Sequence, residues 1–184
     1  MRPLRRDLDL GPELIRLMLP HRPPLLLVDR ILGLRVTSEP AIAAERVIRS
    51  DEPVFQGHFP DLPLWPGVYT IEALAQTALL LFRTLELGGP ESVVQELSAL
   101  DRALRGGAVH PLQARLSAAA GVGVMSAVDV KLSAPVFAGA TLELEAWLQG
   151  GWAGGWRVGV RASSKRRTIA EGTLGLALSV AGLP

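Results

Sequence analysis

Residues 67–87 read GVYTIEALAQTALLLFRTLEL, a nearly continuous apolar run close to the length that crosses a bilayer as a helix. Glu72 and Gln76 lie inside this run, and an ionisable group at the middle of a membrane is costly. Pro66 and Gly67 mark a sharp helix start. Because a helix that is apolar on nearly all sides can be the buried centre of a globular domain, we predict one long central helix and no membrane span.

The segments on either side of this helix predict antiparallel strands. Residues 25–36 are rich in Leu, Ile and Val, and residues 41–49 are their expected partner across a turn at 38–40. Apolar residues also alternate along three segments of the C-terminal third, which glycine or polar turns separate: 141–149, 156–162 and 174–180. A sheet with one apolar face needs a cover, and the long helix supplies it. The sequence therefore predicts an α+β domain in which one long central helix is wrapped by a curved antiparallel sheet.

The length of 184 residues favours a single domain, 1–184. Residues 88–123, between the helix and the last strands, are less regular. Four apolar side chains recur there along one helical face, with polar residues elsewhere: Val93, Leu97, Leu100 and Leu104, against Glu96, Asp101 and Arg105. We predict a short amphipathic helix that ends at Gly106 and Gly107 and packs on the edge of the sheet or binds a partner. A small-residue linker is expected at 118–123.

The composition excludes several classes of function. Hydrophobic residues make up 48% of the chain and charged residues 20%, the balance of a chain that buries a core. The net charge of +1 argues against a nucleic-acid-binding protein. Without cysteine the chain has no disulfide, no cysteine metal site and no thiol nucleophile, and three His without close spacing argue against a metal cluster. The first residues lack the apolar stretch of a secretory signal, so we expect a cytoplasmic location.

Residues that suit proton transfer gather in 55–76, FQGHFPDLPLWPGVYTIEALAQ. His58 stands in a loop that contains three prolines, and a loop histidine is a natural base near neutral pH. Glu72 lies in the second turn of the predicted helix, with Gln76 on the same face where it can orient the carboxyl group. Desolvation on a buried helix would favour the protonated carboxyl group, which could then donate a proton. Gly67 offers its backbone N–H, at the positive end of the helix, to a developing oxyanion.

Each of these groups also has a structural explanation. A single loop histidine is more often structural than catalytic, and Glu72 could simply pair with an arginine such as Arg83. The combination is more specific, because the prolines fix His58 relative to the helix start. The spacing alone does not identify a reaction.

Three blocks of the sequence carry a resemblance: LPHRPPLLLVDRI (19–31), EPVFQGHFPDLPLWPGV (52–68) and IEALAQ (71–76). They closely resemble the FabZ-type 3-hydroxyacyl-acyl-carrier-protein dehydratases of bacterial fatty-acid synthesis. Two later blocks, VDVKLSAPVFAG (128–139) and IAEGTL (169–174), fall where that family has its later strands. The first block together with GHFP and a Glu fourteen residues after its His is a specific signature. The resemblance implies the hot-dog fold, in agreement with the predicted helix inside a curved sheet.

The resemblance also implies a mechanism. His58 would remove the proton α to the thioester and Glu72 would protonate the departing β-hydroxyl group, leaving a trans-2-enoyl chain. Gly67 would donate its N–H to the thioester carbonyl, and Gln76 would support Glu72. No cofactor and no metal are implied.

The resemblance further implies partners and a substrate tunnel. In this family the catalytic His and Glu of one site come from opposite subunits, so the implied unit is a homodimer, often assembled into a trimer of dimers. The acyl chain would arrive on an acyl carrier protein, for which Arg22 and Arg30 of the first block are candidate contacts. Phe59 and Trp65 are the expected tunnel residues, although Trp65 could merely pack under the helix start against Phe59.

The sequence departs from the family pattern at several places. Residues 88–123 are longer than usual and could cover the tunnel mouth or form an oligomer contact. Pro23 and Leu25 stand where aromatic residues are frequent, Trp65 replaces a smaller residue, and residues 138–140 replace the commoner Pro-Gly-Asp. These departures leave open the acyl chain length and a specialised lipid or polyketide pathway. The sequence also leaves open coenzyme A as the carrier. A hot-dog thioesterase and a non-catalytic acyl-binding or assembly subunit also remain as alternatives.

Overall fold

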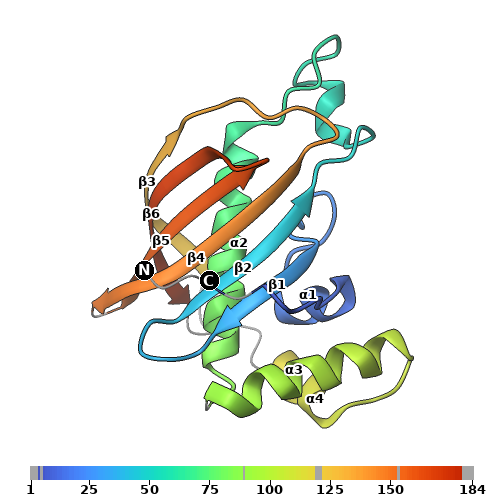
Figure 1. Cartoon of the computed structure of the whole chain (residues 1–184), viewed down its shortest axis with the longest axis vertical. Helices are drawn as coiled ribbons and strands as arrows, with labels where there is room; N and C mark the ends of the chain where they lie inside the picture. The colour runs from blue at the N-terminus through green and yellow to red at the C-terminus, as the bar shows by residue number, and fades with distance from the viewer. Residues whose placement is uncertain (1–3, 5, 89, 119–121, 153, 180–184) are drawn as a thin grey trace.

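Helix α2 (Gly67–Leu85) lies inside a six-stranded antiparallel sheet that curves around it (Figure 1). The computed structural model describes residues 4, 6–88, 90–118, 122–152 and 154–179. The strands follow the spatial order β1-β2-β4-β5-β6-β3, with these bounds: β1 (Arg30–Arg35), β2 (Ala41–Val47), β3 (Val122–Leu132), β4 (Thr141–Trp152), β5 (Gly155–Ser164) and β6 (Arg167–Ser179). The predicted α+β architecture, with a long central helix wrapped by a curved antiparallel sheet, is confirmed.

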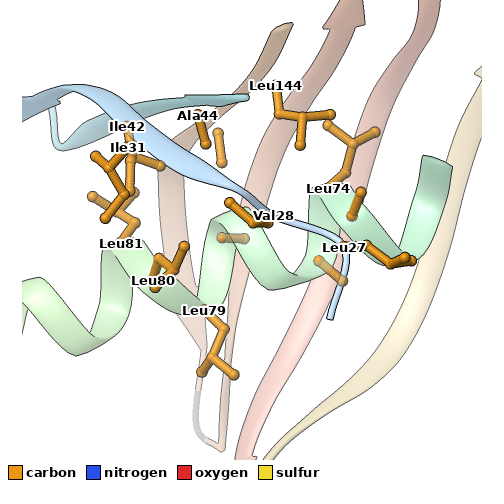
Figure 2. Close-up of a cluster of buried hydrophobic side chains, with 14 of the residues drawn as sticks. Leu27, Val28, Ile31, Ile42, Ala44, Leu74, Leu79, Leu80, Leu81 and Leu144 are labelled. Atoms are coloured by element: carbon orange, nitrogen blue, oxygen red, sulfur yellow. The ribbon is translucent and has the colours of Figure 1, made fainter. Parts of the chain in front are cut away.

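Helix α2 fills the interior of the sheet. Figure 2 shows its apolar side chains facing those of β1, β2 and β4: Leu74, Leu80 and Leu81 with Ile31, Ile42, Ala44 and Leu144. Ala73 and Ala78 are also fully buried, and their small side chains let the strands approach the helix closely. Each buried leucine contributes about 2 kcal/mol of transfer free energy, so this contact supplies much of the stability of the fold. Among the helices of the described residues, none is long and apolar enough to span a membrane.

The first strand is shorter than predicted, because β1 begins only at Arg30. The backbone groups of Leu25 and Leu27 are bonded to a side chain of α2 instead of to a strand. The N–H of Leu27 donates to Oε1 of Gln76 at 2.8 Å, and Nε2 of Gln76 donates to the carbonyl of Leu25 at 2.7 Å. An apolar run alone does not distinguish a strand from an extended segment that is held in this way.

Two helices, α3 (Pro90–Arg105) and α4 (Pro111–Ala118), occupy the segment where we predicted one. They pack mainly against α1 (Pro12–Met18), so the prediction that this segment packs on the edge of the sheet is wrong (Figure 1). The predicted linker at 118–123 is also wrong at its end, because β3 begins at Val122, and residues 119–121 lie outside the described residues.

Asp101 is buried on α3, with only 3% of its surface exposed, although the helical pattern placed it off the apolar face. Its Oδ1 accepts from the backbone N–H of Gly11 at 2.8 Å, and its Oδ2 accepts from Nε of Arg105 at 2.7 Å. These bonds join α3 to the segment that leads into α1. The charge is buried because it has two donors, which the spacing of apolar residues cannot indicate.

We expect Asp101→Ala to lower the free energy of unfolding by about 2 kcal/mol, because it leaves a buried N–H of Gly11 without its acceptor. Urea denaturation of the variant beside the parent chain measures the difference. Asp51→Ala removes an exposed carboxylate and is the matched control, which should unfold at the parent's midpoint. Equal midpoints for the Asp101 variant and the parent would contradict this account of the buried contact.

Candidate active site

His58 is held in a loop between the short helix η1 (Pro53–Gln56) and α2. Its backbone N–H donates to the carbonyl of Val54 at 2.9 Å, and its ring Nδ1 lies 2.9 Å from the carbonyl oxygen of Leu64. Because a carbonyl oxygen can only accept, the neutral ring carries its proton on Nδ1 and its lone pair on Nε2. The imidazole is therefore set in the tautomer that can act as a base through Nε2.

The histidine loop is attached to the chain that follows β3. Trp65 donates its backbone N–H to the carbonyl of Val136 at 2.8 Å, and Ala138 donates to the carbonyl of Pro63 at 3.1 Å. The prolines stiffen the loop, and these backbone bonds fix where it lies. The position of His58 thus depends on a segment far away in the sequence.

A cavity of about 450 Å³ opens beside His58. Its walls come from the histidine loop, the start of α2, the end of β3 with the residues after it, and β6: His58, Leu64, Trp65, Gly67, Thr70, Leu132, Ser133, Ala134, Pro135, Val136 and Ile169. Gly67 is the first residue of α2, and the first amide N–H groups of a helix have no partner within the helix. A Cβ atom at Gly67 would collide with the side chain of Leu132, so glycine permits this close approach. The cavity joins a possible base to the positive end of a helix, where a developing negative charge is stabilised.

Glu72 lines a different cavity, of about 90 Å³, together with Gln76 and His21. Its Oε1 accepts from Nε2 of Gln76 at 2.8 Å and lies 3.3 Å from Nε2 of His21. The Glu72 side chain is 32% exposed, so the expected burial of this carboxyl group is only partial in a single chain. The reason is its position on α2: the continuous buried stretch of the helix begins one residue later, at Ala73.

The alternative pairing of Glu72 with Arg83 is wrong. Arg83 donates to Glu86 at 2.8 Å and to the carbonyl of Leu116 at 2.9 Å, which ties α2 to α4. Within one chain, His58 and Glu72 line separate cavities and do not form one site.

The two predicted tunnel residues differ in their surroundings. Phe59 is 48% exposed and stacks on the imidazole of His58, with 4.3 Å between ring centroids. Trp65 is buried and lines the cavity of His58. Its ring contacts are edge-on to Phe55 at 6.3 Å and to Tyr69 at 5.3 Å, so the expected packing against Phe59 is replaced by packing against these two rings.

Because Trp65 belongs both to this aromatic cluster and to the cavity wall, we expect Trp65→Met to have two effects. The free energy of unfolding should fall by about 3 kcal/mol, as for other large-to-small core substitutions. The kcat/KM ratio for longer over four-carbon acyl thioesters should rise, by up to about 0.8 kcal/mol for each newly accommodated methylene. Thermal unfolding and a chain-length series measure the two effects. Trp152→Met alters an exposed tryptophan and is the control, which should change neither the stability nor the chain-length profile. An unchanged chain-length profile for the Trp65 variant would show that Trp65 does not line the acyl tunnel.

Two polar residues near these cavities were missed by the sequence reasoning. His21 lies within LPHRPP, part of one of the blocks that carry the family resemblance. Nothing else in the sequence indicated that it lies next to Glu72. Arg46 is buried on β2, bridges Asp29 and Glu52, and places its guanidinium carbon 5.5 Å from the ring centroid of Trp65. A buried arginine on an apolar strand cannot be recognised without its partners. No group of three or more His, Cys, Asp or Glu side chains that could hold a metal ion occurs among the residues that the structure describes.

Residues 19–122 match the model of a family described as FabA-like domain, and this match includes His58, Gly67, Glu72 and Gln76. The chain is 58% identical over 64 residues to the 3-hydroxyacyl-[acyl-carrier-protein] dehydratase FabZ of Polynucleobacter asymbioticus, which covers 35% of this chain and 42% of that protein. For the FabZ of Thermotoga neapolitana the identity is 52% over 75 residues, with 40% and 53% covered. For that of Streptococcus thermophilus it is 51% over 78 residues, with 42% and 50% covered. The chain thus spans about half the length of the curated relatives it matches.

Solved structures share the fold over most of this chain. The dehydratase heterocomplex ApeI:P from Xenorhabdus doucetiae matches with a TM-score of 0.58 and 15% identity over 91% of both chains. Cj0977, a sigma28-regulated virulence protein from Campylobacter jejuni, matches at 0.53 and 15% identity, over 91% of this chain and 88% of its own. An HP0420 homologue from Helicobacter felis matches at 0.53 and 9% identity, over 91% and 89%. At these identities the likeness concerns the fold alone, and together with the helix and sheet it confirms the predicted hot-dog fold.

Proposed function

The chain belongs to the family of FabA-like domains, and from this membership we propose that it dehydrates (3R)-3-hydroxyacyl thioesters of acyl carrier protein to trans-2-enoyl thioesters. The observation that carries the proposal is the tautomer of His58. The Leu64 carbonyl favours the proton on Nδ1 and the lone pair on Nε2, and the His58 ring lines a cavity shared with the first residue of α2. This is the arrangement that proton abstraction next to a thioester carbonyl requires.

The proposed reaction is an elimination of water. Nε2 of His58 takes the proton from the α-carbon, and the charge that develops on the thioester oxygen is stabilised by the N–H of Gly67. The β-carbon–oxygen bond breaks as the departing hydroxyl group takes a proton from Glu72, and water leaves. His58 ends protonated and Glu72 ionised, and proton exchange with solvent restores both groups. These steps use only side chains and a backbone amide.

The position of β3 in the sheet supports a homodimer, which is the assembly that this mechanism uses. Strand β3 ends the sheet, and within the described residues it pairs only with β6, so its outer edge is open to another strand. Apolar side chains along it are exposed: Val124, Met125, Val128 and Leu132. Such an edge suits pairing with a second copy of the same strand about a two-fold axis.

This pairing would unite the two cavities. Gly123 and Met125, near the start of β3, line the cavity of Glu72, whereas Leu132, at its end, lines the cavity of His58. In an antiparallel pair centred near Val128, the start of one β3 would lie beside the end of the other. Glu72 of one protomer would then approach His58 of the other, and each dimer would hold two shared sites.

The test of this proposal is an assay of the purified chain with crotonyl and longer enoyl thioesters of acyl carrier protein and of coenzyme A. A dehydratase hydrates the enoyl chain in the reverse direction and keeps the thioester intact. Release of free thiol would instead support the thioesterase alternative. Binding without either reaction would support a non-catalytic acyl-binding subunit, and sedimentation of the same sample shows whether the dimers assemble further into hexamers.

Recognition of the acidic carrier is expected at an arginine-rich groove of about 430 Å³, whose walls include α1, the start of β1, β2 and the residues around η1. Four arginines line it, with two acidic residues: Arg16, Arg30, Arg46 and Arg49, with Asp29 and Glu52. Arg22 is less suited to this role than the sequence indicated, because its guanidinium donates to the backbone carbonyls of Leu19 and His21. Arg30 is half exposed beside Asp9 and stays a candidate contact.

We expect the double variant Arg16→Glu and Arg49→Glu to raise the KM for acyl-carrier substrates about tenfold at low salt, through lost charge complementarity. Added salt should weaken carrier binding to the parent and narrow the difference between the two chains. Arg157→Glu, at an exposed arginine of β5, is the matched control. A carrier KM that is indifferent both to salt and to the groove variant would favour coenzyme A thioesters as the substrate. A cytoplasmic location stays a prediction, and the choice between fatty-acid synthesis and a specialised lipid or polyketide pathway stays open.

A further inference from the structure

His21 lies directly against the proposed acid. Its Nε2 is 3.3 Å from Oε1 of Glu72, and the two side chains are 28% and 32% exposed. Nε2 of Gln76 donates to the same oxygen at 2.8 Å. Oε1 of Glu72 is therefore close to two nitrogen atoms, one in the His21 ring and one in the Gln76 amide, whereas Oε2 has neither contact.

The orientation of the Gln76 amide is determined by backbone groups on both of its ends. The N–H of Leu27 donates to one end of the Gln76 amide, and only the amide oxygen can accept, so Oε1 lies at that end. Nε2 donates to the carbonyl of Leu25, and its second N–H is directed to Glu72. Since Gln76 is only 1% exposed, water does not compete for these bonds. Gln76 is therefore a fixed donor to Glu72.

The ring of His21 has a corresponding preference. Its Nδ1 is buried and has no hydrogen-bond partner among the described residues. A buried N–H without an acceptor is more costly than a buried lone pair that has a weak partner or none, so the proton is favoured on Nε2, which lies 3.3 Å from Oε1 of Glu72. The backbone around the ring is fixed as well, because Arg22 donates to the carbonyls of Leu19 at 2.9 Å and of His21 at 2.6 Å.

We propose that His21 is a positioning residue for Glu72: it donates Nε2–H to Oε1, so that the transferable proton of the carboxyl group resides on Oε2. This inference rests on the proposed function, in which Glu72 protonates the departing hydroxyl group. With Oε1 occupied by two donors, a proton on that oxygen would clash with their hydrogens. His21 and Gln76 together thus choose which oxygen of Glu72 delivers the proton and hold the carboxyl group in one rotamer.

The kinetic test compares two variants of similar size. His21→Leu removes the donor, and we expect kcat to fall about tenfold with KM little changed, because substrate binding does not use this contact. His21→Gln keeps an N–H that reaches Glu72 and should recover most of kcat. Thermal unfolding of both variants verifies that they are folded. Equal kcat values for His21→Leu and the parent, or equal losses in the Leu and Gln variants, would overturn the proposal.

A second measurement does not depend on activity. The ¹⁵N signals of the His21 ring should show the proton on Nε2, and Glu72→Gln should shift them while leaving those of His110 unchanged. Signals that place the proton on Nδ1, or that do not respond to Glu72→Gln, would overturn the proposal. If the parent chain fails to hydrate enoyl thioesters, the proposed function fails, and these spectra still decide whether His21 donates to Glu72.

Discussion

His58→Ala should lower kcat for dehydration by about 10³-fold and leave the chain folded, because general acid–base groups contribute on that scale. His58 lines the cavity with Gly67, and Nε2 is the ring nitrogen that the Leu64 carbonyl does not contact; alanine removes the imidazole without adding bulk. Hydration of crotonyl thioester, followed continuously, measures the loss. Glu72→Gln should cause a loss of similar size, because an amide cannot deliver the proton to the departing hydroxyl group.

The controls for these variants are residues of the same types placed elsewhere. His110→Ala alters a histidine between α3 and α4, whose Nδ1 accepts from the N–H of Leu112, and it should leave kcat unchanged. Glu39→Gln alters an exposed carboxylate in the turn before β2 and should also be neutral. Near-normal turnover in either the His58 or the Glu72 variant would show that the assigned mechanism is wrong.

An equal mixture of the two inactive variants should recover about a quarter of the parent activity after subunit exchange, from the statistics of a two-fold dimer. Half of the dimers would contain one chain of each kind. In such a dimer one shared site has lost both groups, and the other has both native groups. This recovery is an increase of more than a hundredfold over either variant alone, given the loss expected for each.

The mixing experiment needs one further sample. A mixture of His58→Ala with a chain that carries both substitutions forms dimers without any native site, and it should stay inactive. Mass spectrometry of differently labelled chains verifies that subunits have exchanged. Absence of recovery after verified exchange would exclude a site built from two protomers. His58 and Glu72 would then belong only to the separate cavities of the single chain.

Much of the architecture could be predicted because burial leaves a periodic pattern in sequence. The run that begins at Gly67 is apolar around nearly its whole circumference, as a helix buried inside a domain requires. The alternation along 141–149 and 156–162 matches β4 and β5, because successive strand residues face opposite sides of the sheet. The pattern failed at 25–29 and at Asp101, where polar partners decide the local structure. A backbone segment bonded to Gln76, or a buried carboxylate paired with Arg105, produces no periodic pattern of apolar residues in the sequence.

The sequence by itself determined the fold class. It also showed that the candidate groups lie within one short segment: His58, Gly67 and Glu72. Their chemistry was readable there because a proline-rich loop before a helix start restricts the backbone locally. The tertiary structure alone decided the contacts that surround each group. The Leu64 carbonyl contacts Nδ1 of His58, Gln76 donates to Oε1 of Glu72, and Nε2 of His21 lies 3.3 Å from that same oxygen. The placement of the two cavities at opposite ends of β3 likewise came only from the structure. Each of these depends on contacts between segments distant in the chain, and hydrogen-bond direction across such contacts leaves no trace in local composition or period.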